Sequence, residues 1–134
     1  MPAKHVKSLS KPIFVVQEHH ASHLHWDFRL ELDGVLKSWA VPKEPSMDPS
    51  VKRLAIQTED HAIDYADFEG SIEEGQYGSG MVKIWDKGTF ELEDREDDKI
   101  VFSLTGKRLK GRFTLLKFER AGPKNWLLFK TKQL

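Results

Sequence analysis

One segment constrains the fold more than any other: from His25 to Leu32, polar and apolar residues alternate without a break. Successive side chains of a β-strand point to opposite faces, so the segment predicts a strand with one polar and one apolar face. Asp33-Gly34 follows, a strong signal for a hairpin turn, and a second strand is predicted from Val35 to Val41. The large apolar side chains fix the register of the first strand, because a shift by one residue would expose them all.

The rest of the chain is divided by glycine and proline into further short strands. Asp86-Lys87-Gly88 predicts a second hairpin, Pro42 to Pro49 an irregular loop, and Asp60 to Asp67 a weak helical turn. The additional predicted strands cover residues 14–18, 53–58, 80–85, 89–93, 99–105, 112–119 and 126–131. So many short strands favour a mostly-β fold, either a closed or nearly closed antiparallel barrel or a sandwich. Of these we expect the single-domain antiparallel β-barrel, with short helical turns and long loops.

Length and composition set the outer limits. A chain of 134 residues is one domain, and we expect a flexible arm at residues 1–12 followed by a β-barrel domain at residues 13–134. The absence of cysteine excludes disulfides, thiol nucleophiles, zinc fingers and iron–sulfur sites. No apolar run approaches the ~20 residues of a membrane span and no signal peptide opens the chain, so we expect a cytoplasmic protein without membrane partners.

The net charge is zero, but the charges are unevenly distributed. Residues 57–104 carry 14 Asp and Glu against four Lys and Arg, whereas residues 105–134 carry nine Lys and Arg against one acidic residue. The basic C-terminal third is either a surface that faces phosphates or a solvated strand pair that faces the acidic middle of the chain.

Histidines gather at the start of the alternating strand: four of the six lie between His19 and His25. On the polar face of the strand, His25, Asp27 and Arg29 follow one another, each within about 7 Å of the next. Imidazole and carboxylate can share a divalent cation, with His19 or His23 as a further ligand, while the guanidinium can hold an anion. These ligands suit manganese, iron or catalytic zinc; the alternative is a polar barrel face with ordinary histidines.

Two enzyme classes match this segment in part. Binuclear metallohydrolases carry His-x-His-x-Asp-His, but Phe28 stands in place of the last histidine. Iron(II) oxygenases carry the His-x-Asp found here as His25-Trp26-Asp27, together with a distant third histidine in a longer chain. The one histidine further along this chain, His61, is close in sequence.

A second group of polar residues follows the strand predicted at residues 53–58. His61 and Tyr65 are spaced i and i+4, so one helical turn would align them, and both can donate a proton or a hydrogen bond to developing charge. The alternative is a surface turn with an incidental His and Tyr. Lys43 and Arg53 are each plausible phosphate contacts, although each alone is more often a surface cation.

Longer strings of these residues resemble one known family, the phosphoesterase domain of bacterial ligase D, a multidomain enzyme of non-homologous end joining. The resemblance is strong over about residues 13–90 and looser beyond. The strings that carry it are Phe14–His19, Leu24–Glu31, Asp33–Lys43, Glu59–His61, Asp64–Gly70 and Glu74-Gly75. Because this chain contains no ligase or polymerase module, we expect a stand-alone member of the family.

The resemblance implies a manganese-dependent enzyme on a β-barrel scaffold, with other divalent transition metals as substitutes for Mn²⁺. Such enzymes remove a 3′-terminal ribonucleoside as phosphodiesterases, leaving a 3′-phosphate, and then remove that phosphate as phosphomonoesterases to give a 3′-hydroxyl. By position, the implied metal ligands are His19, His25 and Asp27. The implied catalytic residues are Arg29, His61 and Tyr65. The implied phosphate and substrate contacts are Lys43 and Arg53, with Gln17, Ser38 and Glu59 as adjacent candidates.

The chain departs from the family pattern before the first strand. Ligase D domains carry an Arg-Asp-Phe segment and a further acidic residue there, whereas Met1 to Pro12 contain no Arg, Asp or Glu. The resemblance therefore does not extend to any contribution of that segment, above all to the phosphomonoesterase step. The expected partners are nucleic acid 3′ ends, such as a primer-template with 3′ ribonucleotides, and a separate DNA ligase and polymerase of end joining.

Two rival functions stay open at this point. One is a small iron(II) and 2-oxoglutarate oxygenase that uses His25 and Asp27. The other is a non-catalytic barrel that binds nucleic acid through its basic C-terminal third.

Overall fold

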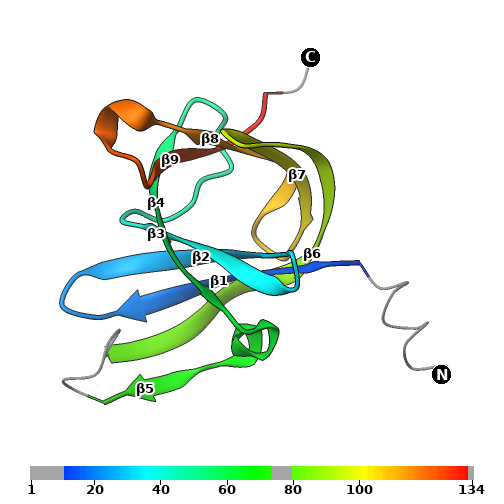
Figure 1. The fold of residues 1–134 in the computed structure, drawn as a ribbon. Coiled ribbons are helices and arrows are strands. Elements are labelled where there is room, and N and C mark those ends of the chain that lie inside the picture. Colours follow the sequence, from blue (N-terminus) through cyan, green and yellow to red (C-terminus); the bar gives the residue numbers. More distant parts are fainter. Residues whose placement is uncertain (1–10, 74–79, 133–134) are drawn as a thin grey trace, which may run out of the picture.

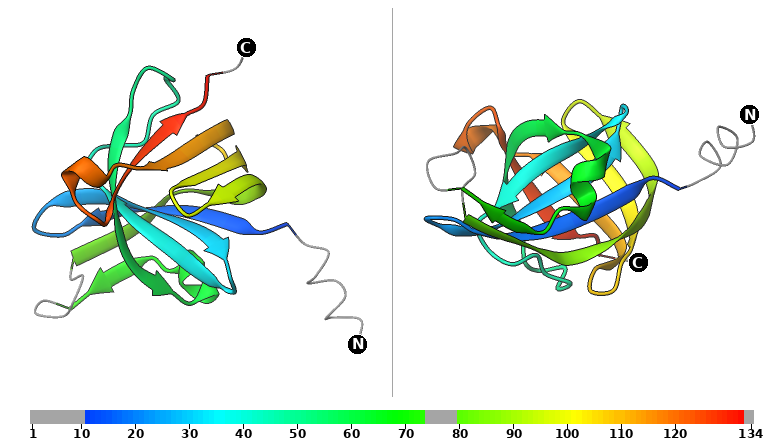
Figure 2. Two further views of the ribbon diagram at one scale, coloured as in Figure 1. Left: turned by 45° about the horizontal axis from the view of Figure 1, so that its top comes forward. Right: turned by 90° about the horizontal axis from the view of Figure 1, so that it is seen from below.

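The computed structural model describes residues 11–73 and 80–132, and within them the chain forms a closed antiparallel β-barrel (Figures 1 and 2). The strands follow the order β1-β2-β3-β4-β9-β8-β7-β6, and β1 pairs with β6 to close the ring, while β5 extends the sheet beyond β6. The strands are β1 (Ile13–His20), β2 (Leu24–Leu32), β3 (Val35–Val41), β4 (Arg53–His61), β5 (Gly70–Ile72), β6 (Gly80–Glu96), β7 (Lys99–Thr105), β8 (Lys110–Lys117) and β9 (Asn125–Lys130). The predicted mostly-β barrel is thereby confirmed.

The inside of the barrel holds the hydrophobic core. Phe28 stacks at a tilt on Phe14 and Phe102, and the ring of Trp39 meets that of Trp126 edge-on. The apolar face predicted for β2 is buried from residue 26 onward, but Leu24 is 43% exposed. Leu24 belongs to the last residue pair at the β1–β2 hairpin end, where little of the core reaches it.

The second predicted hairpin, at Asp86-Lys87-Gly88, is wrong, because these residues lie within β6, which is continuous over 17 residues. The first part of β6 pairs with β1 and the last part with β7. The buried carboxylate of Asp86 accepts hydrogen bonds from backbone N–H groups in the turn between β7 and β8. A Cβ on Gly88 would lie 2.0 Å from the carbonyl oxygen of Thr105. Asp86 and Gly88 thus do not form a turn of their own. They lie in close contact with the distant turn between β7 and β8.

The predicted helical turn at residues 60–67 is shorter than expected. Strand β4 extends to His61, and only the 3₁₀-helix η1 (Ile63–Asp67) follows it; a second 3₁₀-helix, η2 (Glu119–Ala121), precedes β9. No helix among the described residues has the length and apolar character needed to cross a bilayer. The predicted arm at residues 1–12 lies outside the described residues except for Lys11 and Pro12.

Candidate active site

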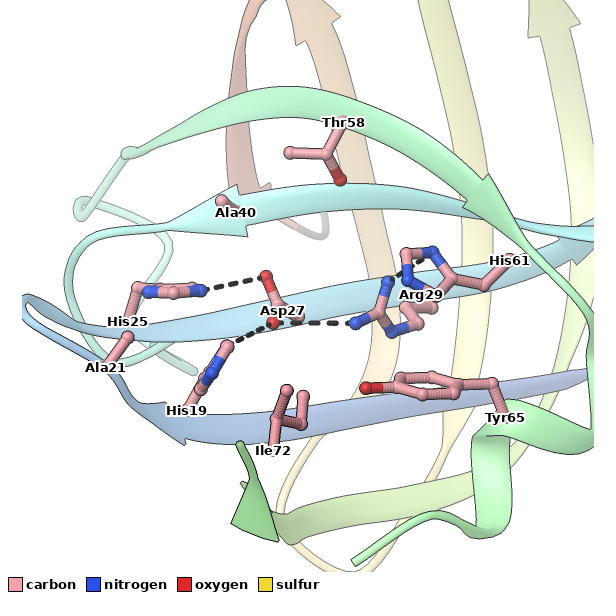
Figure 3. Close-up of a pocket in the computed structure, with 10 residues that line it drawn as sticks. All are labelled: His19, Ala21, His25, Asp27, Arg29, Ala40, Thr58, His61, Tyr65 and Ile72. Carbon is pink, nitrogen blue, oxygen red and sulfur yellow. Dashed lines mark hydrogen bonds and ion pairs between the residues drawn. The ribbon is translucent and has the colours of Figure 1, made fainter. Parts of the chain in front are cut away.

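A pocket of about 300 Å³ lies on the outer face of strands β1 to β4, beside η1 and β5 (Figure 3). Its walls combine three histidines, two charged residues and a tyrosine with four smaller side chains. The lining residues are His19, Ala21, His25, Asp27, Arg29, Ala40, Thr58, His61, Tyr65 and Ile72.

Strand register brings the polar residues together. Across β1 and β2, His19 is the direct partner of His25, and Gln17 is the partner of Asp27. Across β2 and β3, Arg29 is the partner of Ser38. The apolar side chains of β2 fill the barrel, so its alternate residues must project outward into this pocket.

One end of the pocket holds His19, His25 and Asp27, called here the ligand end. One potential ligand atom from each residue lies within 4.8 Å of the others. His25 Nε2 is 3.2 Å from Asp27 Oδ1, and His19 Nδ1 is 3.5 Å from Asp27 Oδ2. His19 and Asp27 are buried, with 5% and 7% of their surfaces exposed, so this face of the strands is not exposed to solvent here.

The ligand end has the chemistry of a divalent metal site. Two imidazoles and one carboxylate form a donor set that suits manganese, iron or zinc. His25 Nδ1 lies 3.0 Å from the carbonyl oxygen of His23; a proton donated there leaves Nε2, the nitrogen beside Asp27, as the ligand atom of the ring. Burial alone would raise the pKa of Asp27, but hydrogen bonds from His19 and His25 and the charge of Arg29 hold it well below its usual range. The carboxylate is therefore ionised and ready to bind a cation.

The other end holds Arg29, His61 and Tyr65, called here the arginine end. Arg29 is 4% exposed, and its guanidinium is held by hydrogen bonds: Nε donates to Gln17 Oε1 at 2.6 Å, and Nη1 donates to Ser38 Oγ at 2.8 Å. Nη2 lies 3.5 Å from Asp27 Oδ2, which links the two ends of the pocket. Several of the N–H groups of Arg29 thus face the protein, which fixes the guanidinium in one orientation.

His61 and Tyr65 meet over this guanidinium. His61 Nδ1 is 3.0 Å from Arg29 Nη1, the two rings are 4.7 Å apart, and the Tyr65 ring lies 5.0 Å from the Arg29 carbon Cζ. Burial, followed by the charge of Arg29, lowers the pKa of His61, so its imidazole is neutral at pH 7. Burial raises the pKa of Tyr65, which keeps its hydroxyl protonated. No shared helical turn aligns the pair, because His61 ends β4 and Tyr65 lies in η1.

Of the remaining candidate residues, some hold the catalytic candidates in place and others lie outside the pocket. Gln17 is fully buried behind Arg29, and its Nε2 also donates to the carbonyl oxygens of Tyr65 and Phe68, so it ties η1 to the guanidinium. Ser38 is likewise a support. Glu59 contributes its carbonyl oxygen, 3.0 Å from His61 Nδ1, while its side chain is exposed.

The structure does not place Lys43 and Arg53 in this pocket. They line a separate hollow beyond the end of β3, together with Pro42, Lys52 and Leu54. Conversely, sequence reasoning missed Ala21, Ala40, Thr58 and Ile72, which line the pocket without carrying charge. Thr58 was within reach of a sequence argument, since it lies in a predicted strand; the other three side chains carry no polar group that would single them out.

Comparison of the sequence with known proteins identifies the family of this chain. Residues 17–117 match the model of the DNA ligase D 3′-phosphoesterase domain. The multifunctional non-homologous end joining protein LigD of Pseudomonas aeruginosa is 53% identical over 125 residues, which cover 89% of this chain and 15% of that protein. LigD of Mycobacterium tuberculosis is 50% identical over 123 residues (89% and 16%), and LigD of Mycolicibacterium smegmatis is 43% identical over 143 residues (98% and 18%).

The chain thus spans less than a fifth of the length of these relatives. Within that span the agreement covers every strand from β2 to β8 and both ends of the pocket. The resemblance noted in the sequence is confirmed, and the chain belongs to the family of ligase D 3′-phosphoesterase domains.

Proposed function

We propose that this protein is a manganese-dependent phosphodiesterase and phosphomonoesterase that heals the 3′ ends of RNA or RNA-tipped DNA. The observation that carries the proposal is the single pocket in which a two-histidine, one-carboxylate ligand end adjoins a buried guanidinium. Family membership supports a phosphoester substrate at a nucleic acid 3′ end. A separate DNA ligase and polymerase of end joining are the proposed partners.

The ligand end would hold the cation through His19, His25 and Asp27. Mn²⁺ held there would supply Lewis-acid polarisation of a phosphate oxygen. The buried carboxylate is held in place by both histidines and by Arg29, so the site is ordered before the cation binds.

The arginine end would act on the phosphate itself. The fixed positive charge of Arg29 stabilises the negative charge that builds up on the phosphoryl oxygens. His61, neutral at pH 7, and the protonated hydroxyl of Tyr65 can each donate a hydrogen bond to a phosphate or leaving-group oxygen. Each step is a net hydrolysis that consumes one water. In the diesterase step the oxygen of water ends on phosphorus as the terminal P–O5′ bond breaks, O5′ takes up a proton, and the nucleoside leaves while the strand keeps a 3′-phosphate. In the monoesterase step the P–O3′ bond breaks in the same way, O3′ takes up a proton to become the 3′-hydroxyl, and inorganic phosphate leaves.

The test is to incubate the purified protein with Mn²⁺ and a DNA strand that ends in ribonucleotides, and to read the 3′-end chemistry of the products by mass spectrometry. We expect a 3′-phosphate followed by a 3′-hydroxyl, and no reaction in excess chelator. Full activity in metal-stripped protein would contradict the metal dependence. Turnover that requires 2-oxoglutarate and oxygen would instead identify an oxygenase, and binding without any product would identify a non-catalytic barrel.

A further inference from the structure

A second hollow, of about 330 Å³, lies between the β3–β4 loop and the turn that joins β7 to β8. Trp85 and Arg108 face each other there, with the Arg108 carbon Cζ 4.7 Å from the centroid of the indole ring. Trp85 is the one tryptophan of the four that is not buried in the core. The cation–π contact favours this arrangement of the two side chains, and part of the indole stays accessible from the hollow.

The backbone places Trp85 there by an irregularity of β6. Opposite β1, Val16 pairs with Asp86 and Gln17 with Ile84, so Trp85 is the extra residue of a β-bulge. A bulge re-aims a side chain out of the regular alternation, and bulges are common beside binding sites. Trp85 packs against the edge of the core while the rest of its ring faces the hollow.

Arg108 is fixed from the opposite side of the hollow. The buried carboxylate of Asp86 accepts hydrogen bonds from the backbone N–H groups of Lys107, Arg108 and Leu109, at 2.9, 3.1 and 2.8 Å. The turn is therefore rigid, although the Arg108 side chain is exposed. Two neighbouring residues of the bulge thus hold Arg108: Asp86 accepts a hydrogen bond from its backbone N–H group, and Trp85 contacts its guanidinium.

Cationic residues lie along the chain between the residues of this hollow and those of the candidate active site. Arg53 lines it and also lines the next hollow along β3 and β4, where Lys43 and Lys52 lie. That hollow begins two residues beyond Ala40, which lines the active-site pocket. Among the described lining residues of the Trp85 hollow Glu44 is the one carboxylate, and its carbonyl oxygen accepts a hydrogen bond from Arg53 Nε.

We propose that the Trp85–Arg108 pair is a nucleobase-stacking subsite for the single-stranded part of the substrate. A base stacks against the indole and guanidinium, while Arg53 and Lys43 contact the phosphates between this subsite and the reacting 3′ end. Aromatic and arginine side chains beside cationic grooves bind single strands in this sequence-tolerant way. The proposal rests on the proposed function for the identity of its ligand, and it explains why Arg53 lies outside the active-site pocket.

The first test measures binding without catalysis. A DNA strand of about twelve nucleotides, within the usual range of single-strand sites, is titrated in chelator while tryptophan fluorescence is followed. We expect the emission to change on binding, and Arg108→Ala to raise the dissociation constant about tenfold, the scale of one lost stacking contact. Trp85→Phe, which keeps an aromatic ring in the bulge, should abolish the emission change. Arg120→Ala in η2 is the matched control, since it removes an equal charge beyond the other end of β8.

The second test compares substrates. In Mn²⁺, the ratio of kcat/KM for a long ribonucleotide-tipped strand to that for a dinucleotide should fall about tenfold in Arg108→Ala and stay at the wild-type value in Arg120→Ala. Equal effects of the two substitutions, or an unchanged emission in the wild type, would overturn the subsite. If the wild type cleaves neither substrate, the proposed function fails, and the metal-free titration still decides whether the subsite exists.

Discussion

The two ends of the active-site pocket differ in how they are built and in how they titrate. The ligand end comes from one hairpin, since His19, His25 and Asp27 lie on paired strands β1 and β2. The arginine end joins β2 to His61, 32 residues further along, and to η1. At the ligand end a hydrogen bond to Asp27 raises the pKa of His25, whereas at the arginine end burial and Arg29 lower the pKa of His61.

We interpret this difference as a separation of the two tasks proposed for the pocket. The ligand end concentrates negative charge and lone pairs, which attract a cation. The arginine end combines a fixed cation with neutral hydrogen-bond donors, which suit an anion. If the division is real, substitutions at one end abolish metal binding, and substitutions at the other slow turnover with the metal still bound.

The largest effect is expected from Asp27→Asn at the ligand end. The substitution removes the carboxylate that lies beside both histidines and removes the ion pair between Asp27 and Arg29. Mn²⁺ binding, followed by calorimetry, and phosphoesterase activity should both fall to background. Retained Mn²⁺ affinity would place the metal elsewhere.

At the arginine end, Arg29→Lys should be nearly as damaging as Arg29→Ala, lowering turnover on the order of 10²–10³. Lysine keeps the charge but cannot donate to Gln17 and Ser38 from one planar group, so their buried polar atoms lose partners at about 1–3 kcal/mol each. Steady-state kinetics and thermal unfolding should both register the change. A lysine variant with wild-type turnover would reduce Arg29 to a distant charge.

His61→Ala should lower turnover on the order of 10² while Mn²⁺ affinity barely changes. The imidazole contacts Arg29 and Tyr65, and no atom of His61 belongs to the ligand cluster. The measurement is a pair of Mn²⁺ binding titrations, with His25→Ala as the reference variant. Equal loss of affinity in the two variants would make His61 a ligand and erase the distinction between the ends.

The sequence predicted those parts of the fold that depend on local patterns and failed where a contact joins distant segments. Period-2 alternation in β2 gave both its core and its outward-facing residues, and Asp33-Gly34 located the first hairpin, because these signals are local. The residues Asp86-Lys87-Gly88, where a second hairpin was wrongly predicted, are as typical of a turn as Asp33-Gly34. Their carboxylate and glycine instead meet a turn about 20 residues away, and no local pattern encodes that contact.

The candidate site was predicted in the same uneven way. His25, Asp27 and Arg29 followed from alternation, and His61 and Tyr65 were singled out by their spacing. The resemblance selected His19 over His23 as the further ligand and implied the role of each residue. None of these sources could give the role of Gln17, which depends on three partners from β2, η1 and the residue after it. We expected Lys43 and Arg53 beside the phosphate. They lie instead just after the end of β3 and at the start of β4, where they line the neighbouring hollow.

The smallest predicted effect tests the opposite pKa shifts directly, in metal-free protein. A lowered pKa means that the unfolded state binds more protons, so the stability associated with His61 is complete above about pH 6.5 and is lost as pH falls through its folded-state pKa. A raised pKa has the reverse sign: the stability associated with His25 is complete below about pH 6.5 and is lost as pH rises through its folded-state pKa.

Replacing each histidine by glutamine should therefore give curves of opposite slope when the difference in melting temperature from the wild type is plotted against pH. As the pH falls, the melting temperature of His61→Gln should rise relative to that of the wild type, because the substitution removes a group that resists protonation beside Arg29. The melting temperature of His25→Gln should fall relative to that of the wild type, because the wild type alone can form the charged pair with Asp27. Both imidazoles are only partly buried, so the shifts should be small, and their sign decides the matter. Parallel curves would show that the two ends do not differ electrostatically, and the separation of cation binding from phosphate activation would then rest on the kinetic variants alone.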